Sequence, residues 1–204
     1  MNYNIKLKNI SKKYGDNIIL DNVDLHFDNN HIYVLIGKNG CGKSTLLNII
    51  SKYDTNYDGC YENNELTIGY LLQDDLLFRN LTVKENFTLQ VKALYRGNNH
   101  EKINSMARKL GLLDFLNKKV SELSGGEKKK VAIGQIILTN ADIILLDEPT
   151  ANIQKEHAKD LLNIIYNEFK EKILIIASHD NLYNYDDKCL VKVKLKNGKV
   201  HYGI

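Results

Sequence analysis

The fold class of this 204-residue chain follows from one short motif, Gly37-Lys-Asn-Gly-Cys-Gly-Lys43-Ser44-Thr45. It has the form G-x-x-x-x-G-K-S/T, in which glycines let successive backbone N–H groups surround phosphate oxygens. The apolar run at residues 31–36 predicts a buried strand before it, and residues 45–50 predict a helix after it. Because strand, loop and helix occur in this order, we expect a phosphate-binding loop rather than a chance glycine-rich turn.

The side chains of this loop suit a nucleoside triphosphate with Mg²⁺. Lys43 would contact the β- and γ-phosphates, and the Ser44 hydroxyl would be a ligand of Mg²⁺. The N-terminus of the helix that follows would add its partial positive charge. We expect the phosphates to lie against the remaining residues of the loop, which are Gly37, Lys38, Asn39, Gly40, Cys41, Gly42 and Thr45.

A second motif, Ile143-Ile-Leu-Leu-Asp147-Glu148, places two carboxylates after four apolar residues. Ligands of parallel sheets bind at the carboxyl ends of strands, so a buried strand ending here would carry both carboxylates to the nucleotide. Asp147 suits the Mg²⁺ shell, and Glu148 suits a general base that orients the attacking water. Such a pair alone is more often a helix cap or a solvated turn, but beside a phosphate loop the catalytic interpretation is the better one.

Strand-like and helix-like segments alternate along the chain, which predicts a mostly parallel sheet covered by helices. The stretch 76–126 has no strand pattern, and we interpret it as a helical insert. Thr82-Val-Lys-Glu85 predicts a capping box, and Asn197-Gly198 predicts a hairpin turn. The other predicted segments are strands at 3–7, 68–72, 173–178, 191–195 and 200–204, and helices at 82–95, 101–110, 127–138 and 155–170, with a break at 96–99.

The composition is that of an ordinary globular protein, with 43% apolar and 26% charged residues. The net charge of +3 is too small to indicate nucleic-acid binding, and Lys128-Lys-Lys130 is typical of a solvated helix face. No apolar run reaches the roughly 20 residues of a membrane-spanning helix, and no secretory signal is visible. Cys41, Cys60 and Cys189 lack metal-ligand spacing, so we expect reduced thiols in a cytosolic protein.

Leu123-Ser-Gly-Gly-Glu127 resembles the signature motif of ATP-binding cassette (ABC) ATPases, and it stands before the carboxylate motif, as in that family. Independently of the resemblance, Ser124 followed by Glu127 predicts a capped helix N-terminus, which attracts phosphate. The resemblance implies that Ser124, Gly125 and Gly126 contact the γ-phosphate bound to a second subunit. It therefore implies a dimer, of this chain or with a related ATPase, in which two ATP sites are shared.

The resemblance covers nearly the whole chain and adds three site residues. Tyr14 resembles the aromatic residue that stacks on adenine, although a lone tyrosine before a strand is nearly as often an ordinary surface or core residue. Gln73 resembles the glutamine that contacts Mg²⁺ and water. His179, before Asp180, resembles the switch histidine that contacts the γ-phosphate.

The family fold implies a single ABC ATPase domain over residues 1–204, with ATP and Mg²⁺ as cofactors. Its α/β, P-loop NTPase core, with a mostly parallel sheet and an N-terminal antiparallel β subdomain, would occupy residues 1–75 and 127–204. The inserted helical subdomain would occupy residues 76–126.

The chain departs from the family pattern in places. Gln154 stands where an Asp usually crosses the dimer interface, and this puts the coupling between the two sites in doubt. Lys130 replaces a usual Arg, and Gly134-Gln135 replaces a usual Ala-Arg pair. Only 30 positions separate Lys43 from Gln73, so we expect a trimmed surface hairpin. Since Asp147, Glu148 and the phosphate loop keep the pattern, we expect hydrolysis.

The resemblance implies an ATPase that powers a transporter. No spanning run is present, so the membrane-spanning permease would be a separate chain, and this chain would lie at the cytoplasmic face of the cell membrane. The loop 74–87 is most like that of small exporters of peptides, bacteriocins or drugs, and its Leu76, Leu77 and Phe78 would form either an apolar docking patch or part of the helical core. The alternative is a soluble ABC ATPase in assembly or repair. The sequence does not establish the substrate, the direction of transport or the identity of the partner.

Overall fold

The computed structural model describes residues 3–94, 100–151, 153–179 and 189–203. These residues form two compact units. Within them, the first unit takes in residues 3–70 and 142–148 and the described part of 170–203, and the second takes in residues 71–141 and 149–169. The first unit is built from strands and helix α1 (Lys43–Ile50), and the second from the other helices.

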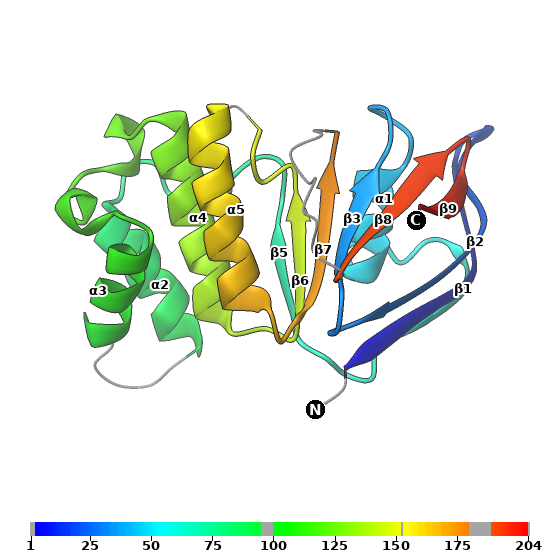
Figure 1. Ribbon diagram of the computed structural model, residues 1–204, viewed down its shortest axis with the longest axis horizontal. Helices are drawn as coiled ribbons and strands as arrows, with labels where there is room; N and C mark the ends of the chain where they lie inside the picture. The colour runs from blue at the N-terminus through cyan, green and yellow to red at the C-terminus, as the bar shows by residue number, and fades with distance from the viewer. Residues whose placement is uncertain (1–2, 95–99, 152, 180–188, 204) are drawn as a thin grey trace. The chain divides into compact units, whose positions relative to one another are not determined.

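The first unit contains a six-stranded sheet in the order β5-β6-β7-β3-β8-β9 (Figure 1). Pairing is parallel from β6 through β7 and β3 to β8, and β9 lies antiparallel to β8. The strands β6 and β7 are buried along their whole length, which explains their continuous apolar sequences. The bounds are β3 (Ile32–Ile36), β5 (Ile68–Leu71), β6 (Ile143–Asp147), β7 (Ile173–Ser178), β8 (Leu190–Lys196) and β9 (Lys199–Gly203).

The carboxyl ends of β3, β6 and β7 lie at one edge of this sheet, as the arrowheads in Figure 1 show. Ile36 at the end of β3 pairs with Ser178 at the end of β7, and Asp147 at the end of β6 pairs with Ala177. Because neighbouring strands are about 4.8 Å apart, the ends of β3 and β6 are about 10 Å apart across β7. The residues that follow these strands therefore gather at the same edge.

A separate antiparallel sheet in the order β2-β1-β4 contains β1 (Asn4–Tyr14), β2 (Asn17–Asp28) and β4 (Asp58–Glu62). Asn9 and Asn22 have φ values of 53° where the pairing of β1 with β2 is irregular. At each bulge, consecutive buried residues are three sequence positions apart instead of two, as Leu7 and Ile10 are. This sheet is the N-terminal antiparallel subdomain that the family resemblance implies.

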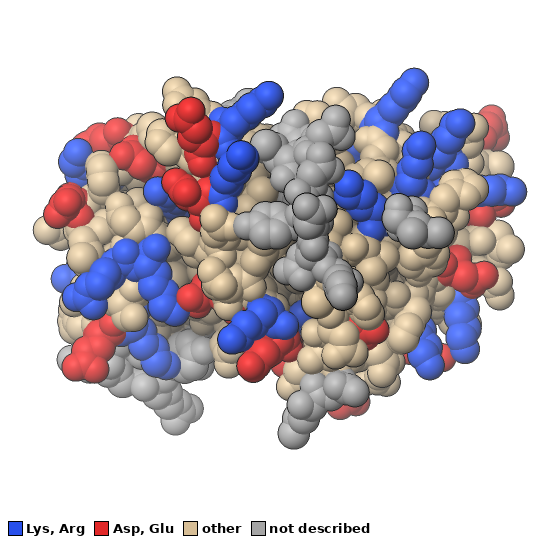
Figure 2. All heavy atoms as spheres, viewed as in Figure 1, with Lys and Arg blue, Asp and Glu red and all other residues tan. Residues whose placement is uncertain are grey.

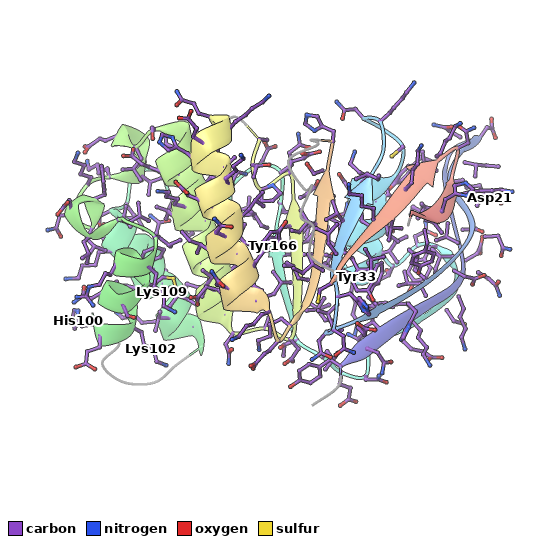
Figure 3. The ribbon with its side chains drawn as sticks, in the orientation of Figure 1. Asp21, Tyr33, His100, Lys102, Lys109 and Tyr166 are labelled. Carbon is purple, nitrogen blue, oxygen red and sulfur yellow. The ribbon has the colours of Figure 1, made fainter. Side chains whose placement is uncertain are left out.

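The core of the first unit joins both sheets to α1. One continuous cluster contains apolar residues of β1, β2, β3, β6, β7 and β8 together with four buried residues of α1, namely Leu46, Leu47, Ile49 and Ile50. At the amino end of β3, Tyr33, labelled in Figure 3, packs edge-on against Phe27 with 4.8 Å between ring centroids. Burial raises the pKa of Tyr33 to about 12. The two elements that flank the phosphate loop are therefore fixed by core packing.

The second unit contains α2 (Val83–Leu94), α3 (His100–Lys109), α4 (Gly125–Thr139) and α5 (Lys155–Phe169). At the start of α2 the Thr82 N–H donates to the Glu85 carboxylate at 2.7 Å and the Glu85 N–H donates to the Thr82 hydroxyl at 3.1 Å, which confirms the predicted capping box. Gly134 of α4 lies against Phe87, so close that a Cβ at Gly134 would be 2.8 Å from the ring. Glycine thus permits the close approach of α2 and α4.

The structure confirms the predicted α/β fold class and the hairpin turn, where Asn197 and Gly198 both have positive φ. Segment 95–99, with the predicted helix break, and Ile204 lie outside the described residues. The assignment of 76–126 as a functional subdomain stays a prediction, and the compact second unit also takes in α4 and α5.

On the viewed face, both units carry Lys or Arg side chains and Asp or Glu side chains side by side, as Figure 2 shows. Within the part of the chain that the structure describes, none of the helices is both long enough and apolar enough to cross a bilayer.

Candidate nucleotide-binding and catalytic site

Three glycines give the loop after β3 its shape. Gly40 and Gly42 have φ values of 78° and 105°, which residues with a Cβ rarely adopt. Gly37 has no room for a side chain, because its Cβ would lie 2.7 Å from the carbonyl oxygen of Leu195 and 2.5 Å from the sulfur of Cys41. The loop therefore requires glycine at both glycine positions of the motif, Gly37 and Gly42, and favours glycine at position 40 as well.

The loop enters α1 through Gly42, which is the N-cap residue of that helix. Among the described residues no side chain caps this helix N-terminus, so its first N–H groups are available to an anion. Lys43 is only 7% exposed, and its ammonium group donates to the carbonyl oxygens of Gly37 at 2.9 Å and of Lys38 at 3.5 Å. The lysine charge is thus held against the loop whose backbone donors would bind phosphate.

Glu148 follows β6 in a strained backbone conformation. Its φ of 50° is uncommon for a residue other than glycine, and its N–H donates to the carbonyl oxygen of Ala177 at 2.9 Å. The buried carboxylate places Oε1 2.8 Å from Nδ1 of His179, and Oε2 accepts a hydrogen bond from the Ser178 hydroxyl at 3.3 Å. Strain of this kind is concentrated at functional sites.

Asp147, the last residue of β6, is 3% exposed. Burial, together with the nearby charge of Asp147, raises the pKa of Tyr70 on β5. Ser44, at the start of α1, is exposed. Carboxylate and hydroxyl oxygens are ligands that Mg²⁺ prefers, so these side chains fit the ion that the phosphate-loop motif implies.

The second unit holds the predicted site residues Ser124 and Gln73. At the N-terminus of α4 the Ser124 hydroxyl accepts from the Glu127 N–H at 3.3 Å, and the Glu127 carboxylate accepts from the Ser124 N–H at 2.7 Å. That N–H donation is the main reason why the pKa of Glu127 lies below its ordinary value of 4.5. Gly125 and Gly126 form the first turn of α4, and Ser124, Gly125 and Gln73 are all exposed.

Tyr14 ends β1 and is 53% exposed. Its phenol O–H donates to the Asp54 carboxylate at 3.1 Å, and the Lys12 ammonium group lies 4.9 Å from the centroid of its ring. An exposed aromatic ring that is anchored at its polar end suits stacking on a planar base.

A family model described as "ABC transporter" matches residues 20–151, which is more than half of the chain. The chain belongs to the ABC transporter family. This confirms the resemblance that the signature motif indicated, and the fold is that of an ABC ATPase domain.

Relatives of this ABC chain include an exporter and importers. The macrolide export ATP-binding/permease protein MacB of Campylobacter jejuni is 33% identical over 93% of this chain and 33% of its own length. The Fe(3+) ions import ATP-binding protein FbpC of Fusobacterium nucleatum is 30% identical over 75% of this chain and 44% of its own length. The chain spans a third to a half of the length of the curated relatives it matches.

A solved structure of an ABC cassette matches almost the whole chain. It is the dimeric structure of a post-hydrolysis state of the ATP-binding cassette MJ0796 bound to ADP and Pi. It is 30% identical and superposes with a TM-score of 0.82, over 98% of this chain and 97% of that one.

The departures of this ABC chain from the family pattern have different structural settings. Gln154 is exposed directly before α5. Gln135 donates to the carbonyl oxygen of Asn86 at 3.4 Å and so links α4 to α2. Asp180, quoted beside His179 in the sequence motif, lies outside the described residues.

The structure brings Glu148 and His179 together and places the phosphate loop at the same sheet edge, whereas Gln73 and Ser124 belong to the other compact unit. The sequence motifs do not include Ser178, and its signal in the sequence is its place directly before His179. The roles assigned to all of these residues stay predictions.

Proposed function

We propose that this ABC chain hydrolyses ATP and powers a membrane-spanning transporter formed by a separate polypeptide. The observation that carries the proposal is the Glu148 carboxylate, which is buried, held by His179 and Ser178, and placed at the same sheet edge as the phosphate loop. A positioned carboxylate beside a phosphate-binding loop suits hydrolysis better than binding alone.

Nucleotide binding would use both ends of the ATP molecule. The loop from Gly37 to Thr45 and the Lys43 ammonium group bind the β- and γ-phosphates, and Tyr14 stacks on adenine. Ser44 and Asp147 would hold Mg²⁺, which neutralises charge on the phosphates when it is bound.

The chemical step would depend on two neighbouring side chains. Glu148 orients the attacking water and accepts its proton. His179 Nδ1 lies 2.8 Å from that carboxylate, and the same side chain would contact the γ-phosphate, so His179 would link the carboxylate to the phosphate. Ser178 supports the same carboxylate from the second oxygen.

We infer a dimer as the working form. The N-terminus of α4 is capped by Ser124 but remains exposed, so it can meet the phosphate of a second subunit. The likeness to a dimeric ABC cassette supports this arrangement. Gln154 would leave an amide at the position of the interfacial carboxylate, and an amide still donates and accepts hydrogen bonds.

The membrane partner would dock on the loop after Gln73. Leu76 and Phe78 are 74% and 58% exposed, which favours a docking patch over a place in the helical core. Export is the direction that we propose, because the match to an exporter covers 93% of this chain and those to importers cover 73–78%. The chain would then work at the cytoplasmic face of the membrane.

Two measurements test this proposal. Phosphate release from ATP by the purified chain tests hydrolysis, and Lys43→Met should abolish it by removing the charge at the phosphates. Co-purification with a polytopic membrane protein, identified by mass spectrometry, tests the partner. Leu76→Glu with Phe78→Glu should prevent that association, whereas Leu113→Glu, at another exposed leucine, should not. Association with a soluble complex alone would contradict the transport proposal.

A further inference from the structure

Lys12 is a buried lysine in the N-terminal sheet. Its side chain is 4% exposed, and its ammonium group forms an ion pair with the Asp54 carboxylate at 2.8 Å. It also donates to the carbonyl oxygen of Asn56 and lies over the ring of Tyr14. Burial of an ammonium group is costly unless it is paired and hydrogen-bonded. These contacts satisfy it.

Asp54 links the same network to the Tyr14 side chain. One carboxylate oxygen accepts from Lys12 at 2.9 Å, and the other accepts from the Tyr14 phenol at 3.1 Å. The hydrogen bond from Lys12 is the main cause that holds the pKa of Asp54 below its ordinary value of 3.8. The carboxylate is therefore charged at neutral pH and accepts both donors. The loop after α1, which contains Asp54, is thereby tied to the end of β1.

The ring of Tyr14 is fixed although it contributes little to the core. It is 53% exposed, and it stands beside the two-residue turn Gly15-Asp16 that joins β1 to β2. Without the phenol hydrogen bond and the cation over its face, the side chain of a residue at such a tip would rotate freely. Since Lys12 occupies one face of the ring, a stacked base has the opposite face.

We propose that Lys12 and Asp54 are positioning residues that hold the Tyr14 ring as a platform for the nucleotide base, which stacks on the face opposite Lys12. This inference rests on the proposed function, in which the chain binds ATP through Tyr14. Lys12 and Asp54 do not touch the nucleotide. They hold the Tyr14 ring in place before the nucleotide binds. The conformational entropy of this side chain is then not lost on binding, and the affinity is higher.

This preorganisation should affect only the part of the binding free energy that the base contributes. Immobilising one side chain on binding weakens affinity by about threefold to tenfold. Inorganic tripolyphosphate carries the phosphates of ATP without the base, so its binding to the phosphate loop should not depend on Tyr14. A purely structural role, in which Lys12 supports the loop after α1 and hence α1 itself, would weaken the binding of both ligands.

The experiment is isothermal titration calorimetry of the full chain with MgATP and with magnesium tripolyphosphate. Lys12→Met should weaken ATP binding by about threefold to tenfold and leave tripolyphosphate binding unchanged. Lys13→Met is the matched control, because Lys13 is the exposed neighbour on the same strand and loses the same charge. In a chain that already carries Tyr14→Ala, Lys12→Met should have no further effect on ATP binding.

The outcomes separate this inference from the proposed function. If Tyr14→Ala leaves ATP affinity unchanged, the proposed stacking role itself fails. If Tyr14→Ala weakens ATP binding but Lys12→Met does not, the positioning role is wrong and the stacking role survives. Equal weakening of ATP and tripolyphosphate by Lys12→Met also overturns the positioning role. If Lys12→Met does not fold, as a thermal melt would show, Asp54→Asn is tested in its place with the same expected pattern.

Discussion

Gly134 allows a quantitative test of how α4, the helix that begins at the signature motif, packs in the second unit. A Cβ at this position would lie 2.7 Å from Cδ1 of Leu110 and 2.8 Å from two ring carbons of Phe87. Phe87 is fully buried, so its ring cannot turn away into solvent. Gly134→Ala is therefore a probe of this close approach.

Two opposing effects set the size of the change. Alanine in a helix interior is favoured over glycine by about 1 kcal/mol. Forcing one extra carbon into a filled core costs about 1–3 kcal/mol. The cost of overpacking is expected to exceed the gain in helix propensity, because the contacts would be shorter than 3.0 Å. The net destabilisation is therefore expected to be about 0–2 kcal/mol.

The assay is urea unfolding of four full-length chains, which are the wild type, Gly134→Ala, Phe87→Leu and the double variant. Phe87→Leu alone destabilises because it leaves a cavity. In that background Gly134→Ala should destabilise less than it does in the wild type, because the clash with the ring is gone and the helix propensity remains, while the 2.7 Å contact with Leu110 is still made. The two changes should thus couple by more than about 0.5 and up to about 3 kcal/mol. Additive free energies of unfolding, within about 0.5 kcal/mol, would refute the packing argument.

Three other predictions concern the loop, the signature helix and the Asp54 ion pair. Alkylation of Cys41 should abolish ATP binding, with bound ATP protecting the thiol. An alkylated Cys41 with nucleotide binding intact, shown by mass spectrometry and calorimetry, would contradict the loop geometry. Ser124→Ala should cost about 1 kcal/mol of unfolding free energy and also lower phosphate release. Thr82→Ala, which removes the same kind of cap from α2, should cost as much and leave phosphate release unchanged. Because the pKa of Asp54 is lowered in the folded chain, its stabilisation is complete above its ordinary value of 3.8 and is lost as the pH falls through the folded value. The unfolding free energies of wild type and Asp54→Asn, followed by circular dichroism, should differ at pH 6 and converge below pH 3.8; a constant difference would argue against this ion pair.

The sequence predicts those parts of the fold whose physical signal is local. The glycines of the phosphate loop, the continuous apolar strands β6 and β7 and the capping boxes at Thr82 and Ser124 each follow from a few adjacent residues. All of these are found in the structure.

Strands β2 and β4 had no such signal. The bulge at Asn22 separates the buried residues Leu20 and Val23 by three positions, which interrupts the alternation expected of a strand. In β4 (Asp58–Glu62) only Tyr61 is partly covered, so no alternation exists to be detected. Only the family resemblance indicated this antiparallel sheet.

The motifs supply the candidate catalytic residues, but the contacts that hold these side chains have no signal in the sequence. The motif identified Glu148, yet its positive φ and its hydrogen bond from Ser178 depend on the pairing of β6 with β7. Similarly, Lys12 lies inward on β1 only because of the bulge at Asn9. The residues that support a site are set by how strands pair in the folded chain. The residue pattern of a single segment carries no information about that pairing.

Hydrolysis at a site shared by two subunits is tested by Glu148→Gln. Asp147 and Lys43 are unchanged, so ATP should still bind. Without a carboxylate to accept the proton of water, phosphate release should slow by roughly two to four orders of magnitude. Bound ATP would then persist, and mass action would favour the closed dimer.

The measurement combines phosphate release with light scattering of the Glu148→Gln chain, with and without ATP. We expect the variant to bind ATP, to release almost no phosphate and to become dimeric only when ATP is present. Release at the wild-type rate would remove Glu148 from the mechanism. A variant that retains ATP yet stays monomeric at high concentration would contradict the shared site.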